Sequence, residues 1–232
     1  MEAADRVVLD PHERRVIGTL IEKGLSTPQA YPLSLNALTT GCNQRNNREP
    51  ITNFTDEQVE EIAQRLQARG LVSVVHPATG RVYRYRQEFG RNYEMRRAEL
   101  AVLGELLLRG AQTEGELRQR ASRMENIATL DDLHQILNGL RAKTPSFVVR
   151  ITPEGTSRGV VWSHACCEAA ELDQLKERER SGVAFASASP SSGSSVAEVA
   201  VPRDDLIARI EALERRVARL EQHEGRGGPN DA

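Results

Sequence analysis

The sequence predicts a mainly α-helical protein with small β-hairpins, an α+β fold made of two tandem winged-helix domains and a C-terminal helical coiled-coil segment. The first observation behind this prediction is an internal repeat. Val16 corresponds to Val102 at an offset of 86 positions, and Thr55 corresponds to Thr129 at an offset of 74, so the second copy is 12 residues shorter between its matched helices. The second observation is that helical periodicity changes to strand periodicity after three helices in each copy. The third is a C-terminal heptad pattern.

Two helices are predicted at the start of the first copy. Asp10 stands where a helix cap belongs, Pro11 takes the favoured first helical position, and Gly24 ends the apolar stripe. Ser34 can cap a second, short helix that carries Leu35 and further apolar residues on one side. A polar loop follows this second helix.

The third helix of the first copy is predicted to open at Thr55 with a capping pattern and to stop at Gly70. Directly afterwards, residues 71–75 and 81–86 alternate as strands around a tight turn. Three helices followed by a β-hairpin describe the winged-helix form of the helix-turn-helix fold, in which the third helix enters a major groove and the hairpin contacts the neighbouring backbone.

The second copy repeats this order. Its helices are predicted at 93–109, 114–121 and 130–143, and its strands at 147–151 and 160–164. We therefore expect winged-helix domain 1 at 7–90 and winged-helix domain 2, with a trailing helix, at 91–180. We refer to these two segments as the first and the second copy.

One stretch of the first copy, residues 27–51, carries a specific motif, TPQAYPLSLNALTTGCNQRNNREPI. Its matching positions are Tyr31, Pro32, Leu33, Leu35, Asn36, Cys42, Asn43, Gln44, Arg48 and Pro50. Through these residues the chain, over roughly 9–165, resembles the YceH-like family of uncharacterised bacterial tandem winged-helix proteins. Gly41 and Arg45 depart from the Ala and Lys that are commoner there. The resemblance implies the fold and a bacterial cytosolic setting, and it brings no established activity.

The Asn/Arg turn, residues 43–48, joins the second and third helices and is expected near the nucleic-acid face of a winged helix. It consists of Asn43, Gln44, Arg45, Asn46, Asn47 and Arg48. Arginines there can pair with phosphates, and the amides can reach phosphates or base edges. Alternatively, the Asn residues only supply turn conformations and local backbone hydrogen bonds.

A second basic cluster runs from the hairpin into the second copy. It comprises Arg81, Arg84, Arg86, Arg91, Arg96 and Arg97, interleaved with Tyr83, Tyr85 and Tyr93. Guanidinium groups suit phosphate oxygens. Alternatively, these residues lie on a solvent-exposed strand face and form salt bridges between the two domains.

The third helix of the first copy argues against DNA. Its first half carries four carboxylates, Asp56, Glu57, Glu60 and Glu61, and only Arg65 and Arg69 favour phosphate. With a formal net charge of −2, the chain also lacks the excess of basic residues that is typical of nucleic-acid-binding proteins. The leading prediction is a nucleic-acid-binding, transcription-regulator-like protein with double-stranded DNA as partner and its site in the first copy. The alternative is a protein-interaction scaffold without DNA binding.

No catalytic or cofactor site is predicted. The five histidines lack HExxH spacing, and the sequence has neither a Gly-rich phosphate loop nor a GxSxG elbow. Cys42, Cys166 and Cys167 form no CxxC pair, so we expect reduced structural thiols and no bound metal. The acidic start and the lack of a long apolar run predict a cytoplasmic protein without a membrane span.

The C-terminal part is predicted to dimerise the chain. A Ser/Ala/Gly-rich linker at 181–202 precedes a short coiled-coil helix at 203–224. Its seam is Leu206, Ile210, Leu213, Val217 and Leu220. β-branched residues at a with Leu at d favour a parallel homodimer. The alternative is a single amphipathic helix that docks on the globular part of its own chain.

Overall fold

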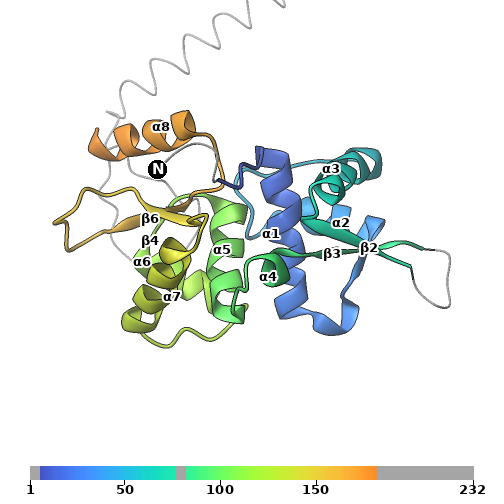
Figure 1. Cartoon of the computed structure of the whole chain (residues 1–232), viewed down its shortest axis with the longest axis horizontal. Helices are drawn as coiled ribbons and strands as arrows, with labels where there is room; N and C mark the ends of the chain where they lie inside the picture. The colour runs from blue at the N-terminus through green and yellow to red at the C-terminus, as the bar shows by residue number, and fades with distance from the viewer. Residues whose placement is uncertain (1–5, 77–81, 182–232) are drawn as a thin grey trace, which may run out of the picture. The chain divides into compact units, whose positions relative to one another are not determined.

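The same order of helices and strands occurs twice in the computed structural model, which describes residues 6–76 and 82–181 (Figure 1). The elements of the first copy are α1 (Pro11–Ser26), the 3-10 helix η2 (Pro28–Ala30), β1 (Leu33–Ser34), α2 (Leu35–Cys42), α3 (Asp56–Ala68), β2 (Val72–Val75) and β3 (Arg84–Gln87). The short helix α4 (Phe89–Asn92) spans the junction, and the second copy continues with α5 (Arg97–Arg109), β4 (Gln112–Thr113), α6 (Glu114–Ala121), α7 (Leu130–Ala142), β5 (Val148–Arg150), β6 (Val161–His164) and α8 (Ala169–Arg180). The expected α+β class, mainly helical with small antiparallel strand groups, is confirmed.

Each copy holds a three-stranded antiparallel sheet. The strand orders are β1-β3-β2 and β4-β6-β5. Leu33 pairs with Tyr85 in the first sheet, and Gln112 pairs with Trp162 at the equivalent place in the second. The third strands, β1 and β4, were not expected from the sequence, because two residues are too few to show an alternation.

Two helix boundaries differ from the sequence prediction. The helix expected at 93–109 is interrupted, since Glu94 adopts a left-handed φ of 48° between α4 and α5. α5 begins at Arg97, where the Glu99 carboxylate accepts a hydrogen bond of 2.8 Å from the Arg96 backbone N–H. α1 continues past Gly24 to Ser26, and Gly24 instead leaves room for the ring of Tyr31.

The expected helix caps are present. The Asp10 carboxylate accepts hydrogen bonds of 2.8 Å from the backbone N–H groups of His12 and Glu13, and Thr55 caps α3 through the N–H of Gln58. Such caps satisfy N–H groups that have no partner inside the helix. They explain why these helices begin where the sequence indicates.

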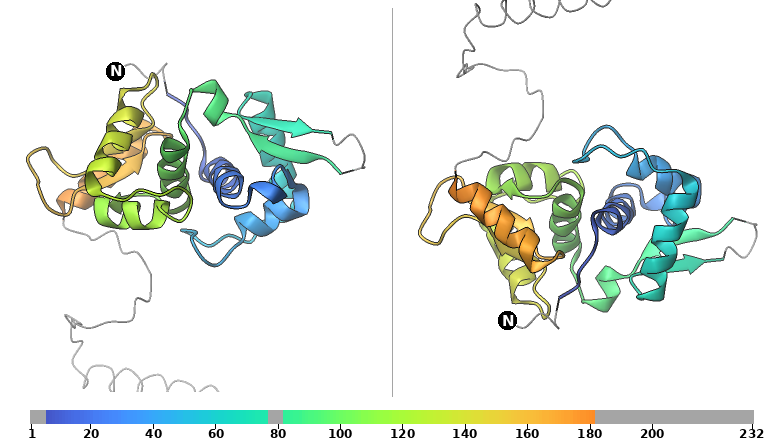
Figure 2. Two further views of the ribbon diagram at one scale, coloured as in Figure 1. Left: turned by 90° about the horizontal axis from the view of Figure 1, so that it is seen from below. Right: turned by 90° about the horizontal axis from the view of Figure 1, so that it is seen from above.

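The two copies pack through their first helices, α1 and α5, which lie side by side in both views of Figure 2. A methyl group on Gly104 would lie 2.7 Å from Cγ2 of Ile21, and one on Gly18 would lie 3.3 Å from Cβ of Leu107. The repeat offset of 86 maps the first pair onto the second. The copies therefore meet as a self-complementary pair around an approximate two-fold axis, with antiparallel helices, as identical subunits do in a symmetric dimer.

A continuous apolar core joins the copies beyond this helix pair. The ring centroid of Phe147, in the second copy, lies 6.0 Å from that of Phe89, at the end of the first copy. Buried residues of both copies belong to one cluster. Residues 7–90 and 91–180 therefore form a single unit.

Candidate functional site

The Asn/Arg turn lies against the second copy. The Glu49 backbone N–H, just after the turn, donates a hydrogen bond of 2.9 Å to the Leu108 carbonyl of α5. Arg109 donates one of 2.8 Å to Oδ1 of Asn47, whose φ of 59° is left-handed. Asparagine tolerates this conformation better than most residues. The turn is thus a contact between the copies.

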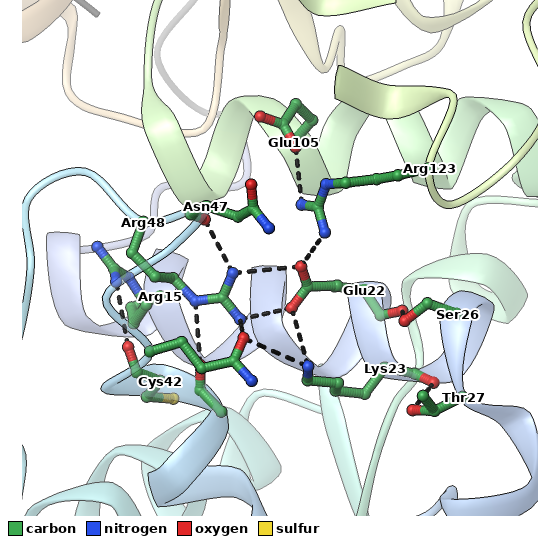
Figure 3. A network of polar contacts seen from close by, with 12 residues as sticks. Arg15, Glu22, Lys23, Ser26, Thr27, Cys42, Asn47, Arg48, Glu105 and Arg123 are labelled. Atoms are coloured by element: carbon green, nitrogen blue, oxygen red, sulfur yellow. Dashed lines mark hydrogen bonds and ion pairs between the residues drawn. The ribbon is translucent and has the colours of Figure 1, made fainter. Parts of the chain in front are cut away.

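Arg48 is buried under this turn and pairs with Glu22 of α1 (Figure 3). The two side chains are 0% and 2% exposed, and Nη2 of Arg48 lies 2.5 Å from Oε2 of Glu22. Nε of Arg48 also donates to the Gly41 carbonyl at 3.0 Å. In this conformation Arg48 does not face solvent and is not placed to contact a phosphate, contrary to what its position in a polar turn indicates.

A ring of charged contacts continues from Glu22 into the second copy. Arg123 donates to Oε1 of Glu22 and, at 2.8 Å, to Oε2 of Glu105 on α5. Nε of Arg109 lies 3.2 Å from the other oxygen of Glu105. Because Arg109 binds Asn47 and Arg48 donates to the Asn47 carbonyl at 2.8 Å, the ring closes on itself. Bidentate, charge-assisted contacts of this kind are strong and directional.

The ring lowers the pKa of its central carboxyl group. Burial alone would raise the pKa of Glu22, but the hydrogen bonds and charges of Arg48 and Arg123 outweigh it and bring the pKa to about 2. Glu22 is therefore ionised at neutral pH. Because it is held between guanidinium groups, it is suited to joining the copies and not to proton transfer.

The other charged members of the ring, Glu22, Glu105, Arg109 and Arg123, were not predicted from the sequence. One signal was available. Glu22 follows Leu20 and Ile21, and Glu105 stands among apolar residues of α5, so both carboxylates interrupt helix faces that are otherwise buried. A buried carboxylate needs a cationic partner.

The amides of the turn are also used within the protein. Asn43 accepts from the Phe54 backbone N–H and donates to the Phe54 carbonyl, both at 2.8 Å. Gln44 accepts from Lys23 and Arg48 at 3.3 Å. These contacts match the alternative in which the turn residues supply local structure. Arg45 and Asn46 are the exposed members of the turn.

The expected cations of α3 are held by the start of α1. Nη2 of Arg65 lies 3.2 Å from Oδ2 of Asp10, and Nη1 of Arg69 lies 2.8 Å from Oε2 of Glu13. Arg69 also donates to the Val8 carbonyl at 2.5 Å. Their charge is therefore partly neutralised within the first copy.

The carboxylates of α3 have no such compensation. Glu57 and Glu61 are exposed and Glu60 is partly exposed, and none of the three forms an ion pair within 6–76 and 82–181. The Glu57 carboxylate accepts hydrogen bonds from the Glu57 backbone N–H and from the Thr55 side chain, and these lower its pKa. The outer surface of α3 therefore presents negative charge, and we call these three glutamates the α3 acidic face.

The basic cluster of the hairpin is divided among separate contacts. Nη1 of Arg84 donates to the Pro32 carbonyl at 2.9 Å, and Arg86 pairs with Glu88 at 3.0 Å. Arg97 pairs with Glu125 at 2.9 Å. Arg81 lies outside the described residues, and so does the predicted coiled-coil seam, Leu206, Ile210, Leu213, Val217 and Leu220.

Comparison with known proteins identifies the family. A family model described as "Protein of unknown function, DUF480" matches residues 9–158, which is more than half of the chain. The chain belongs to this family. The UPF0502 protein YceH of Salmonella newport (strain SL254) is 38% identical over 216 residues, which cover 90% of this chain and 91% of that relative. YceH of Salmonella typhimurium (strain LT2) matches with the same identity and coverage. The YceH-like resemblance of the sequence is confirmed.

The described part of this family member shows neither a candidate membrane span nor a candidate metal site. No helix there is long and apolar enough to cross a membrane. No group of three or more His, Cys, Asp or Glu side chains within 6–76 and 82–181 is arranged to hold a metal ion.

Proposed function

We propose that the protein is a non-enzymatic protein-interaction module made of two winged-helix copies, and that the α3 acidic face docks a basic surface of a partner protein. The order of helices and strands in each copy, with a third short strand beside the hairpin, supports the winged-helix assignment. Winged helices can serve as docking modules, so the function must be argued from the site.

One observation carries this proposal. Four of the cations expected to contact DNA in the first copy have partners inside the protein, namely Arg48, Arg65, Arg69 and Arg84. Glu57, Glu60 and Glu61, in contrast, have no ion-pair partner among the described residues. A DNA groove is lined by phosphates and would repel this face. A surface rich in Lys or Arg would be attracted to it and guided into register.

The test is affinity purification of the full chain from bacterial cells, with nuclease present. We expect the unmodified protein to recover one stoichiometric partner, and the variant Glu57→Lys/Glu61→Lys to lose it. The matched control, Asp173→Lys/Glu177→Lys, makes the same charge change on the exposed surface of α8 and should retain the partner. Equal recovery by both variants, or recovery that disappears with nuclease, would overturn the proposal.

DNA binding is the second candidate, since Arg45 and Asn46 remain exposed in the Asn/Arg turn and Tyr83, on the hairpin, is 53% exposed. A pool of duplex DNA tests it at low and moderate salt. Binding near about 50 mM salt that weakens steeply as salt rises would support this candidate, because counterion release drives such binding. No binding near 50 mM salt would dismiss it.

The oligomeric state and the location of the protein belong to the same proposal. We infer a homodimer from the heptad seam at 206–220, which includes Ile210 and Leu213, and a cytoplasmic location from the family resemblance. A dimer would present two α3 acidic faces and raise the avidity for a partner with two basic surfaces.

A further inference from the structure

A cavity of about 320 Å³ lies in the second copy, where the N-terminal segment, the end of α7, β5 and α8 meet. Three arginines line it, each from a different part of the chain. Arg6 precedes α1, Arg141 lies in the last turn of α7, and Arg150 ends β5. One carboxylate, Glu154, is also present. The formal charge of the cavity lining is therefore positive, in contrast to that of the α3 acidic face.

The three guanidinium groups keep unused hydrogen-bonding capacity. The Nε atoms of Arg6 and Arg150 are buried, and neither has an acceptor among residues 6–76 and 82–181. Nη2 of Arg150 donates a hydrogen bond of 2.6 Å to the Thr156 carbonyl. The nearest carboxylate oxygen to Arg141 is on Glu154, 4.0 Å away. Buried donors are nearly always satisfied, so two unpaired ones at one cavity indicate an acceptor that residues 6–76 and 82–181 do not supply.

The walls of the cavity are fixed by contacts that do not involve these donors. The Leu9 backbone N–H donates to the Cys166 carbonyl at 3.3 Å, which holds the segment after Arg6 against the second copy. Arg14 of α1 pairs with Glu171 of α8 at 2.6 Å, and Leu172 of α8 is buried. A site held by packed elements keeps its shape before a ligand arrives, which lowers the cost of binding.

We propose that this cavity binds the phosphate group of a small phosphorylated molecule. Guanidinium groups present planar forks of donors that match phosphate oxygens, and three of them approach the cavity from separate elements. Val148, Ala165 and Leu172 supply an apolar wall for the remainder of the molecule. The volume lies at the lower end of the range for small-molecule sites. This site is independent of the α3 acidic face and of the function proposed for it.

The proposal is tested by calorimetric titration of the full chain with three probes: inorganic phosphate, glycerol 3-phosphate and acetate. We expect saturable binding of both phosphate probes below about 10 mM, and acetate to bind at least about tenfold more weakly, because a carboxylate offers fewer oxygens and less charge. Arg6→Ala and Arg141→Gln should each weaken phosphate binding about tenfold or more. The Arg141 side chain is 57% exposed, so Arg141→Gln should leave the fold intact, and Arg6 precedes the first helix, so Arg6→Ala alters no helix.

The matched control is Arg178→Gln, which removes one positive charge from the exposed surface of α8 and away from the cavity lining. It should bind phosphate as the unmodified protein does. A folded Arg6→Ala or Arg141→Gln protein with unchanged affinity would overturn the proposal. So would equal weakening by Arg178→Gln, acetate binding as tight as phosphate, or no saturable binding of either phosphate probe.

Discussion

Replacing Glu22 by Gln should strongly destabilise the unit formed by the two copies. Glu22 is buried and bridges Arg48 of the first copy and Arg123 of the second. The fall in the carboxyl pKa from 4.5 to about 2 corresponds to about 3 kcal/mol of stabilisation at neutral pH. Removing one partner of a buried pair costs about 3–5 kcal/mol in general, since the other charge is left without compensation. We therefore expect Glu22→Gln to lower the free energy of unfolding by about 3 kcal/mol.

The assay is urea unfolding at neutral pH, with Glu57→Gln as the matched control. Glu57 undergoes the same chemical change at an exposed position, and its substitution should alter the free energy of unfolding by no more than about 0.5 kcal/mol. The double variant Glu22→Leu/Arg48→Met should recover most of the loss, because it removes the uncompensated guanidinium as well. A loss below about 1 kcal/mol for Glu22→Gln, or none beyond that of Glu57→Gln, would show that the Glu22 bridge does not stabilise the protein.

The same substitution predicts a pH dependence. The pKa of Glu22 is lower in the folded protein, about 2, than its ordinary value of 4.5. Its stabilisation is therefore fully present above about pH 4.5 and is lost as pH falls toward 2. The difference in unfolding free energy between the unmodified protein and Glu22→Gln should shrink across this window. A difference that stays constant from neutral pH down to about pH 3 would contradict the role of the ionised carboxylate.

Three further outcomes follow from packing, burial and the heptad pattern. Gly104→Ala should lower the free energy of unfolding by about 1–3 kcal/mol, because its methyl group would lie 2.7 Å from Ile21. Gly115→Ala has open space around it and should raise the free energy of unfolding by about 0.5–1 kcal/mol. Urea unfolding of both variants shows whether the two signs are right. Deleting the residues after Arg180 should convert a dimer into a monomer in light scattering, and an unchanged mass would rule out the coiled coil. Burial raises the pKa of Cys166 to about 12, so this thiol should react with a thiol reagent only after unfolding; rapid labelling of the native protein would count against its burial.

The elements of the fold could be predicted because their signals are local. Thr113 and Thr129 cap their helices by contacts within three residues, and such patterns are visible in any short window of sequence. The strands β1 and β4 are defined instead by pairing with residues about fifty positions away, such as Leu33 with Tyr85. Two-residue segments carry no periodicity of their own, so the sequence could not reveal them.

The arrangement of the two copies shows the same limit. The repeat offset of 86 positions makes Gly18 and Gly104 equivalent residues of the two first helices. In the structure each glycine lies against the other copy's helix, near Leu107 and Ile21. A repeat indicates that two units share a fold, but it does not say which faces of the units meet.

The candidate site was harder to predict, since the polar composition of a segment does not give its burial. The Asn/Arg turn has the composition of an exposed loop, and Arg48 within it has a side chain that is 0% exposed. Its burial depends on Glu22, 26 positions earlier, and on the closeness of the second copy. The acidity of α3 was visible in the sequence, and the structure adds that Arg65 and Arg69 are held by Asp10 and Glu13.

The sign of the charge that α3 presents to a partner is the central claim about function. Fluorescence anisotropy near about 50 mM salt can measure it with two labelled ligands, a Lys/Arg-rich peptide and a duplex DNA pool. We expect the unmodified protein to bind the peptide and not the DNA, and Glu57→Lys/Glu61→Lys to lose peptide binding and gain DNA binding. Tight DNA binding by the unmodified protein, with no gain in the variant, would contradict this claim.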